Sequence, residues 1–88
     1  MIRRRLLVSG RVQGVFYRDT CRSEAGAAGV AGSARNLPDG RVEVVLEGHQ
    51  QSVERVIDWC WKGTPGSSVE DIAISKEEPQ GLDSFRIL

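Results

Sequence analysis

The segment Gly10–Arg18, which reads GRVQGVFYR, carries residue types that can hold an anion. It follows an apolar run and precedes a segment of helical character, so its backbone N–H groups lie at the start of a helix, where they lack partners. Gly14 lets a ligand approach the backbone closely, because glycine has no Cβ. Arg18 adds a planar cation that matches two phosphate or carboxylate oxygens. The segment therefore predicts a cradle for an oxyanion.

This loop does not match the common nucleotide-binding loops. It lacks the three spaced glycines of a dinucleotide site and the Gly-Lys-Ser/Thr ending of a triphosphate site. A glycine-containing loop before a helix is also often no more than a turn. The loop alone therefore leaves an anion site and a plain turn as open interpretations.

A second polar residue with a possible chemical role is Asn36, which comes just before the turn Pro38-Asp39-Gly40. Its amide offers donors and an acceptor, which suffice to orient a water molecule. The ordinary alternative is that the asparagine serves only the turn.

Few side chains could act as a nucleophile or a metal ligand. His49 is the single histidine, and Cys21 and Cys60 are not in a paired spacing. We therefore expect no metal site, no cofactor and no Ser-His-Asp or Cys-His machinery. Phosphoryl transfer to water remains possible, because its loose transition state needs mainly charge stabilisation and a positioned water. A carboxylate leaving group, as in an acyl phosphate, departs as a stable anion without a general acid.

Length and charge narrow the class of protein. The chain has 88 residues, enough for one domain spanning residues 1–88 with a single core. Lys+Arg and Asp+Glu number 12 each, so neither nucleic acid nor an anionic membrane is favoured as a partner. No targeting segment or membrane-length apolar run is present, and the two cysteines are typical of reduced, buried thiols. We expect a cytoplasmic monomer with a small anionic substrate.

The hydrophobic pattern predicts alternating strands and helices. Five strands are expected at 4–9, 31–37, 41–47, 69–75 and 85–88, and two helices at 19–28 and 50–62. In the third strand Val42, Val44 and Leu46 alternate with Arg41, Glu43 and Glu47, which predicts one buried and one mostly solvated face.

The second helix has one apolar stripe formed by Val53, Val56, Ile57, Cys60 and Trp61. Trp59 lies off this stripe and is expected to be partly exposed. The order strand, helix, strand, strand, helix, strand predicts an α+β fold of the split βαβ, or ferredoxin-like, type. That fold has an antiparallel sheet with two helices on one face.

Two linked motifs carry a resemblance to a known family. The loop GRVQGVFYR at 10–18 and the stretch GSARNLPDGRVE at 32–43 closely resemble the acylphosphatases. The resemblance covers nearly the whole chain, including Glu47-Gly48, Gly63-Thr64-Pro65 and Phe85. It implies hydrolysis of acyl phosphates to a carboxylate and inorganic phosphate, without a cofactor. The family also has the ferredoxin-like fold.

The resemblance also implies roles for individual residues. Arg18 would bind the phosphoryl group, and Asn36 would orient the attacking water. The substrate phosphate is thought able to accept the proton of that water. Inorganic phosphate is then expected as both product and inhibitor. The N–H groups of the loop would complete the phosphate site beside Arg18; they belong to Gln13, Gly14, Val15, Phe16 and Tyr17.

Three positions depart from the family pattern. Ser33-Ala34 stands where a bulky aromatic residue and Val are usual, which predicts lost packing volume. Asp19 follows Arg18 directly and could pair with it, although a solvent-facing position at the helix start is favoured. The chain ends at Leu88, where many members have an aromatic residue.

Two other classes of function remain as alternatives. One is a non-catalytic module that binds an acyl phosphate or another anion, as in acylphosphatase-like domains of larger maturation proteins. The other is an RNA-binding domain of the same fold, which would need aromatic residues on the open sheet face. The chain is poor in aromatic residues, and Arg41, Glu43 and Glu47 occupy the positions expected on that face.

Overall fold

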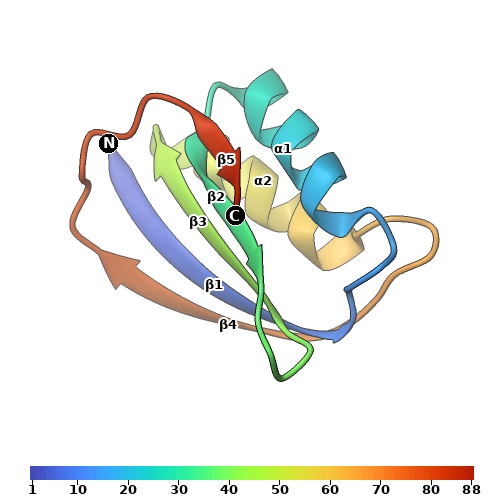
Figure 1. Cartoon of the computed structure of the whole chain (residues 1–88). Coiled ribbons are helices and arrows are strands. Elements are labelled where there is room, and N and C mark those ends of the chain that lie inside the picture. The colour runs from blue at the N-terminus through green and yellow to red at the C-terminus, as the bar shows by residue number, and fades with distance from the viewer.

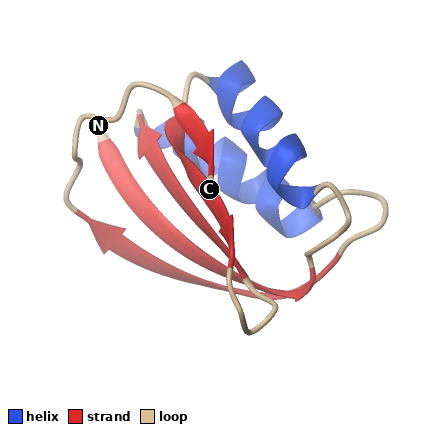
Figure 2. Cartoon of the chain, viewed as in Figure 1, coloured by secondary structure: helices blue, strands red, loops and turns tan.

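The protein is a five-stranded sheet with both helices packed on one face (Figures 1 and 2). The computed structural model describes all residues from 1 to 88. The strands are β1 (Ile2–Arg11), β2 (Ala31–Asn36), β3 (Val42–Gly48), β4 (Ser68–Glu77) and β5 (Phe85–Ile87), and the helices are α1 (Tyr17–Ala28) and α2 (Gln50–Lys62). The ferredoxin-like arrangement predicted from the sequence is confirmed. Neither helix is long and apolar enough to cross a membrane.

The strand order across the sheet is β4-β1-β3-β2-β5. Four strands pair antiparallel, as predicted, but β5 pairs parallel with β2, so the sheet is mixed. The cause is the connection after β4. It leaves one edge of the sheet, crosses one end of it and enters β5 at the opposite edge (Figure 1). β5 therefore runs back toward the end of the sheet where β2 finishes.

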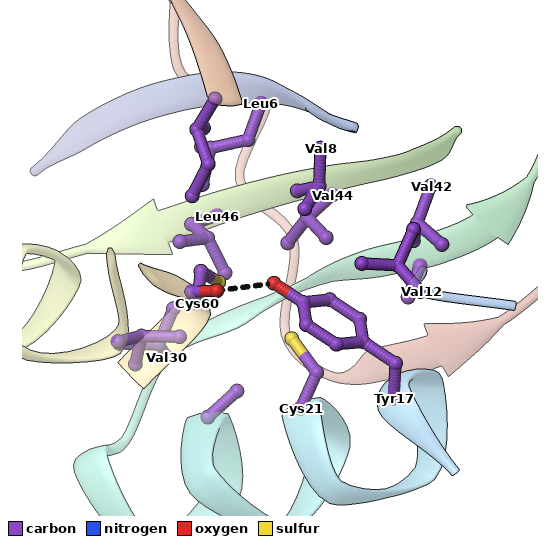
Figure 3. Close-up of a cluster of buried hydrophobic side chains, with 14 of the residues drawn as sticks. Leu6, Val8, Val12, Tyr17, Cys21, Val30, Val42, Val44, Leu46 and Cys60 are labelled. Carbon is purple, nitrogen blue, oxygen red and sulfur yellow. Dashed lines mark hydrogen bonds between the residues drawn. The ribbon is translucent and has the colours of Figure 1, made fainter. Parts of the chain in front are cut away.

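The core lies between the sheet and the helices, with Tyr17 at the start of α1 as its largest fully buried side chain (Figure 3). Val53, Val56 and Cys60 of α2 are buried, as the stripe predicted. Trp61 is not, because 46% of its surface is exposed.

Both tryptophans of α2 border the apolar stripe, and the position of α1 determines which of them is buried. Trp59 packs against Tyr17 of α1, with 5.1 Å between the ring centroids, and is partly buried. Trp61 lies at the other border and meets solvent. The prediction of Trp61 as a core residue was therefore wrong.

The open face of the sheet was expected to be mostly solvated along β3, and this was also wrong. Glu43 and Glu47 are only 8% and 3% exposed. Arg35 of β2 and Arg5 of β1 hold the Glu43 carboxylate at 3.2 and 2.6 Å, and Arg3 of β1 holds that of Glu47 at 2.6 Å. Neighbouring strands thus supply opposite charges at facing positions. Ion pairs between strands therefore cover Glu43 and Glu47 on this face, which carries no aromatic platform for RNA.

Glu47 also holds the chain that leads into β5. Its carboxylate accepts hydrogen bonds from the N–H groups of Gln80 at 2.9 Å and Leu82 at 3.1 Å. Burial alone raises the pKa of this carboxylate, but the hydrogen bonds from Arg3, Gln80 and Leu82 outweigh it and hold the pKa below its usual value. This buried carboxylate therefore ties the β4–β5 connection to the sheet.

Glu47→Gln is expected to lower the free energy of unfolding at pH 7 by about 1–2 kcal/mol, because the charge-assisted hydrogen bonds are lost. Since the folded-state pKa is lowered, the carboxylate stabilises the fold above its unfolded pKa, and this stabilisation is lost as pH falls through the folded value. Urea unfolding at pH 7 and near pH 3 measures both parts. The difference between variant and wild type should shrink in acid, whereas exposed Glu78→Gln should change little at either pH. A constant difference would contradict this role.

Candidate active site

The two motifs meet at one end of the sheet because of the strand register. Val42 at the start of β3 pairs with Val8 of β1 on one side and with Asn36 of β2 on the other. β1 and β2 both run antiparallel to β3, so they run in the same direction and finish at the same end of the sheet. The loop after β1 and Asn36 at the end of β2 therefore lie close together, although β3 separates their strands.

The loop between β1 and α1 presents its backbone N–H groups outward. Gly14 has φ 73° and Phe16, which precedes the first residue of α1, has φ 62°. Outside the regular elements, no backbone hydrogen bond is donated by Gly14, Val15 or Phe16. The N–H groups at the start of α1 have no partner within the helix either. Successive free donors on a left-handed turn form a concave site for an anion.

A pocket of about 270 Å³ opens beside this loop. Its lining joins the loop to α1, to the end of β2 and to β5: Val12, Gly14, Phe16, Tyr17, Arg18, Asp19, Asn36 and Ile87. Arg18 and Asn36 thus share one pocket with much of the predicted loop. Gln13 and Val15 do not line it; the side chain of Gln13 binds the β2–β3 turn, and Val15 lies against Gly66. For these two residues only the backbone N–H groups remain candidates for anion binding.

No Asp or Glu side chain forms an ion pair with Arg18 in this pocket. Its Nη1 donates to the main-chain oxygen of Leu88 at 3.2 Å, which leaves most of its donors free. Asp19 also lines the pocket, but it pairs with Arg22 at 3.7 Å and forms no ion pair with Arg18. The expectation that Asp19 faces solvent agrees with its 65% exposed side chain. The guanidinium is therefore available to an anion.

Asn36 supplies an acceptor that nothing in the protein satisfies. Its Oδ1 is buried and has no hydrogen-bond partner. Along β2 its side chain follows Gly32 and Ala34, which are buried, on the helix side of the sheet. A buried polar atom without a partner is rare and needs a reason. A water or ligand in the pocket would supply the missing bond.

Gln13 ties the loop to the β2–β3 turn. Its Nε2 donates to the carbonyls of Leu37 at 2.8 Å and Arg41 at 3.0 Å. Leu37 is the residue after Asn36, so this side chain sets the distance between the cradle and the asparagine. The sequence predicted a role for Gln13 through its backbone, and this contact of the side chain required the structure.

Gln13→Ala is expected to lower kcat about ten- to hundredfold, because loss of this link misplaces the cradle relative to Asn36. The inhibition constant of inorganic phosphate should change less than kcat, since the phosphate contacts predicted for Arg18 and the loop N–H groups remain. Steady-state kinetics on acetyl phosphate, of the substrate class that the sequence resemblance implies, with phosphate as inhibitor, separates the two effects. Gln51→Ala, on the exposed first turn of α2, is the matched control. Equal losses in kcat and phosphate binding would show that Gln13 does not act by positioning.

Other groups with nucleophilic chemistry lie outside the pocket. His49 is exposed at the far end of β3, one strand length from Val42. Cys21 and Cys60 are free, buried thiols, as predicted, and the neighbouring Cys60 together with burial raises the pKa of Cys21. Tyr17 is buried and donates its hydroxyl to the Cys60 carbonyl at 2.8 Å (Figure 3). Burial raises the pKa of this phenol, so Tyr17 stays protonated and keeps this hydrogen bond. The bond and the burial together fix the end of the loop against α2.

β5 contributes residues that the sequence did not point to. Ile87 lines the pocket. The N–H of Leu88 donates a hydrogen bond to the carbonyl of Ala34 at 2.9 Å, and the main-chain oxygen of Leu88 accepts one from Arg18. A three-residue strand carries little periodic signal, and its parallel pairing with β2 cannot be read from local sequence. The contact between Leu88 and Arg18 also joins residues 70 positions apart, so no local pattern indicates it.

Comparison with known proteins identifies the family of this site. The Acylphosphatase family model matches residues 4–87. The acylphosphatase of Haloquadratum walsbyi is 51% identical over 85 residues, covering 97% of this chain and 91% of the relative. The chain belongs to the acylphosphatase family. Acylphosphatases hydrolyse the carboxyl–phosphate anhydride, and this chain is an enzyme of that class.

Solved acylphosphatases have the same fold. The crystal structure of acylphosphatase from Bacillus subtilis superposes with a TM-score of 0.97 at 35% identity, covering 100% of this chain and 99% of that one. The crystal structure of full-length HypF, in a phosphate- and nucleotide-bound form, matches with a TM-score of 0.89 at 25% identity. That match covers 99% of this chain but 12% of the HypF chain. The acylphosphatase fold thus also occurs as a small part of a larger protein.

Proposed function

We propose that Arg18 and the loop N–H groups bind the phosphoryl group of an acyl phosphate, and that Asn36 orients the attacking water. One observation carries the proposal. A guanidinium that pairs with no Asp or Glu side chain, a row of free backbone donors and a buried Asn36 oxygen without a partner share one pocket. The first two suit an anion whose negative charge is spread over several oxygens. The third suits a water molecule.

The reaction follows from this placement. The water oxygen forms a bond to phosphorus as the bond from phosphorus to the carboxylate oxygen breaks. The carboxylate leaves with the bonding electrons, and a phosphoryl oxygen takes the proton of the water. Attacking and leaving oxygens lie roughly in line. Arg18 and the N–H groups stabilise the charge on the phosphoryl oxygens, and the transition state needs no other charged group.

Asp19 is the one carboxylate among the side chains of the pocket, and it pairs with Arg22 rather than with Arg18. Nowhere in the chain do three or more His, Cys, Asp and Glu side chains gather into a group suited to a metal ion. The leaving carboxylate is already a stable anion, and the substrate phosphate accepts the proton. We therefore propose catalysis without a cofactor.

The test is hydrolysis of acetyl phosphate and benzoyl phosphate by the purified protein. We expect turnover on the order of 1–1000 per second, as is usual for enzymes. Inorganic phosphate should inhibit competitively, and a chelator should leave the rate unchanged. Loss of activity with the chelator would contradict the cofactor-free mechanism. A folded protein that binds phosphate but hydrolyses neither substrate would favour the alternative of an anion-binding module.

We further propose that the chain acts as a single domain and a monomer in the cytoplasm, on a small-molecule acyl phosphate. The free cysteines suit a reducing compartment. On the open sheet face, Arg3, Arg5 and Arg35 are paired with Glu43 and Glu47, so these cations are not free to bind nucleic acid. Light scattering after size-exclusion chromatography tests the oligomeric state.

A further inference from the structure

Phe16 holds a backbone conformation that its own residue type disfavours. Its φ of 62° is the one positive value at a non-glycine residue of the chain. Aromatic residues rarely adopt this conformation, and such strain persists only where the surrounding structure determines it. Because φ sets the direction of the peptide unit before Phe16, it also sets where the Phe16 N–H points. A contact outside the loop must therefore hold that peptide unit.

The two peptide units that flank Phe16 are held by different partners. The carbonyl of Phe16 accepts a hydrogen bond from the N–H of Thr20 at 3.1 Å, which fixes the following unit to the first turn of α1. The carbonyl of Val15, in the preceding unit, accepts a hydrogen bond from the Thr64 hydroxyl at 2.7 Å. Since the helix fixes the following unit, Thr64 is the partner that fixes the rotation about φ.

The bond from Thr64 also determines the side of the loop on which the Phe16 N–H lies. The C=O of Val15 and the N–H of Phe16 belong to one trans peptide unit, so they point in opposite directions. Thr64 holds the carbonyl toward the α2–β4 loop, which lies beside the β1–α1 loop in Figure 1. The pocket lies on the other side, since Gly14 and Phe16 line it and Val15 does not. The N–H of Phe16 is therefore turned toward the pocket.

The α2–β4 loop is built to hold Thr64 in place. The N–H and the hydroxyl of Ser67 both donate to the carbonyl of Thr64, at 3.0 and 2.8 Å. Gly63 has φ 67°, and a Cβ there would collide with the Ser67 hydroxyl, so this turn requires glycine. Tyr17 donates its hydroxyl to a carbonyl in the last turn of α2 at 2.8 Å. The end of α2 and the loop after it thus hold the residues on both sides of Phe16.

We infer that Thr64 is a positioning residue of the anion site: its hydroxyl holds the Val15 carbonyl and so aims the Phe16 N–H at the phosphoryl group. The inference rests on the proposed function, because it uses the loop N–H groups as the phosphoryl site. Thr64 does not line the pocket and acts only through the loop. Its role differs from that of Gln13, which links the loop to the β2–β3 turn. Loss of Gln13 should affect phosphate binding less than kcat, whereas loss of Thr64 should affect both.

Three substitutions separate the hydroxyl from the rest of the side chain. Thr64→Val keeps the branched shape and removes the donor. Thr64→Ser keeps the donor and loses only a methyl group. Thr20→Val is the matched control, because Thr20 is the other threonine of the chain and does not line the pocket. Its bond to Phe16 comes from the backbone N–H, which valine keeps.

Steady-state kinetics on acetyl phosphate, with inorganic phosphate as inhibitor, measures the effect on the site. In Thr64→Val we expect kcat/KM to fall about ten- to hundredfold and the inhibition constant of phosphate to rise about tenfold, because one donor to the phosphoryl oxygens is misdirected. Thr64→Ser should stay within about threefold of the wild type in both values, and Thr20→Val within about twofold. The proteins are compared at a temperature where circular dichroism shows them folded, so a loss of stability alone leaves both values unchanged. Wild-type values in Thr64→Val, or a Thr64→Ser variant as impaired as Thr64→Val, would overturn the inference.

Backbone NMR tests the positioning role without turnover. The backbone carbon chemical shifts of Phe16 report its φ, and its amide signal reports phosphate bound at the N–H. We expect positive φ and a phosphate-dependent amide shift in the wild type and Thr64→Ser, and loss of both in Thr64→Val. Positive φ retained in Thr64→Val would overturn the inference, whatever the rates. A wild type that binds phosphate at this amide but hydrolyses no acyl phosphate would overturn the proposed function, and loss of that binding in Thr64→Val would still support the role of Thr64.

Discussion

Arg18→Gln is expected to lower kcat/KM on acetyl phosphate at least about a thousandfold and to abolish competitive inhibition by inorganic phosphate. An arginine that stabilises the charge of phosphoryl transfer contributes about 10³–10⁵ in rate, and Arg18 is the one cationic side chain lining the pocket. Glutamine keeps donors but has neither the charge nor the fork of the guanidinium. Binding and turnover should be lost together, because in the role proposed for Arg18 the same group meets the phosphoryl oxygens in the ground state and the transition state.

The matched control for Arg18 is Arg22→Gln, one turn further along α1. Arg22 is exposed, pairs with Asp19 at 3.7 Å and does not line the pocket, so its loss changes the net charge equally without removing a residue of the pocket. Its activity should stay within about twofold, since an exposed ion pair contributes little. Arg18 makes an exposed hydrogen bond to Leu88, so its replacement should lower stability by no more than about 1 kcal/mol. Equal losses in both variants would point to a general charge effect.

Asn36→Ala is expected to lower kcat about a hundred- to thousandfold while the inhibition constant of phosphate changes less than about threefold. Loss of one positioned polar group in such a site has an effect of this size. Phosphate binding should survive because Arg18 and the loop N–H groups remain. The fold should also survive, since Asn36 Oδ1 is buried without a partner and its removal eliminates an unsatisfied group.

Stability provides the second measurement for Asn36. A side chain that serves only the β2–β3 turn would lower the free energy of unfolding when truncated, whereas a water-orienting residue should leave it equal or higher. Urea unfolding of Asn36→Ala, set beside its kinetics, distinguishes the two roles. Asn36→Asp keeps the shape but places a negative charge near the phosphoryl group, so it should weaken phosphate binding as well. If Asn36→Ala were destabilised but kept its normal kcat, Asn36 would serve only to stabilise the β2–β3 turn.

The helices and central strands were predictable because their signals are local. α2 occupies Gln50–Lys62, the predicted range, since its apolar stripe repeats at helical spacing and Gly63 ends it. The apolar run Leu6–Val8 indicated a central strand, and β1 lies between β4 and β3. α1 begins at Tyr17 rather than Asp19 because left-handed Phe16 starts it without a capping side chain. The observed strand ends differ from the predicted ones by a few residues, because pairing with neighbouring strands determines where each strand ends.

Burial along the sheet and on α2 was harder to predict because it depends on neighbours. Glu43 and Glu47 resemble solvent-facing residues in any local pattern, yet arginines of adjacent strands cover them. Trp61 resembles a core residue, but α1 packs on the side of Trp59. Ser33 and Ala34, which depart from the family pattern, both lie in β2, where Ala34 is fully buried and Ser33 is partly exposed. These outcomes follow from pair contacts between distant residues.

The chemical inventory of the site was present in the sequence: a permanent cation at Arg18, a loop that frees its N–H groups, an amide at Asn36, and no other group suited to nucleophilic or metal chemistry. Residue type alone sets charge and hydrogen-bonding capacity, so these needed no coordinates. The tertiary structure decided their relative positions. The register across β3 brings Asn36 beside the loop, and the return of the chain through β5 brings Leu88 to Arg18. Thr64 of the α2–β4 loop donates a hydrogen bond to the Val15 carbonyl of the β1–α1 loop. Such contacts join residues far apart in the chain, and only long-range pairing of strands can specify them.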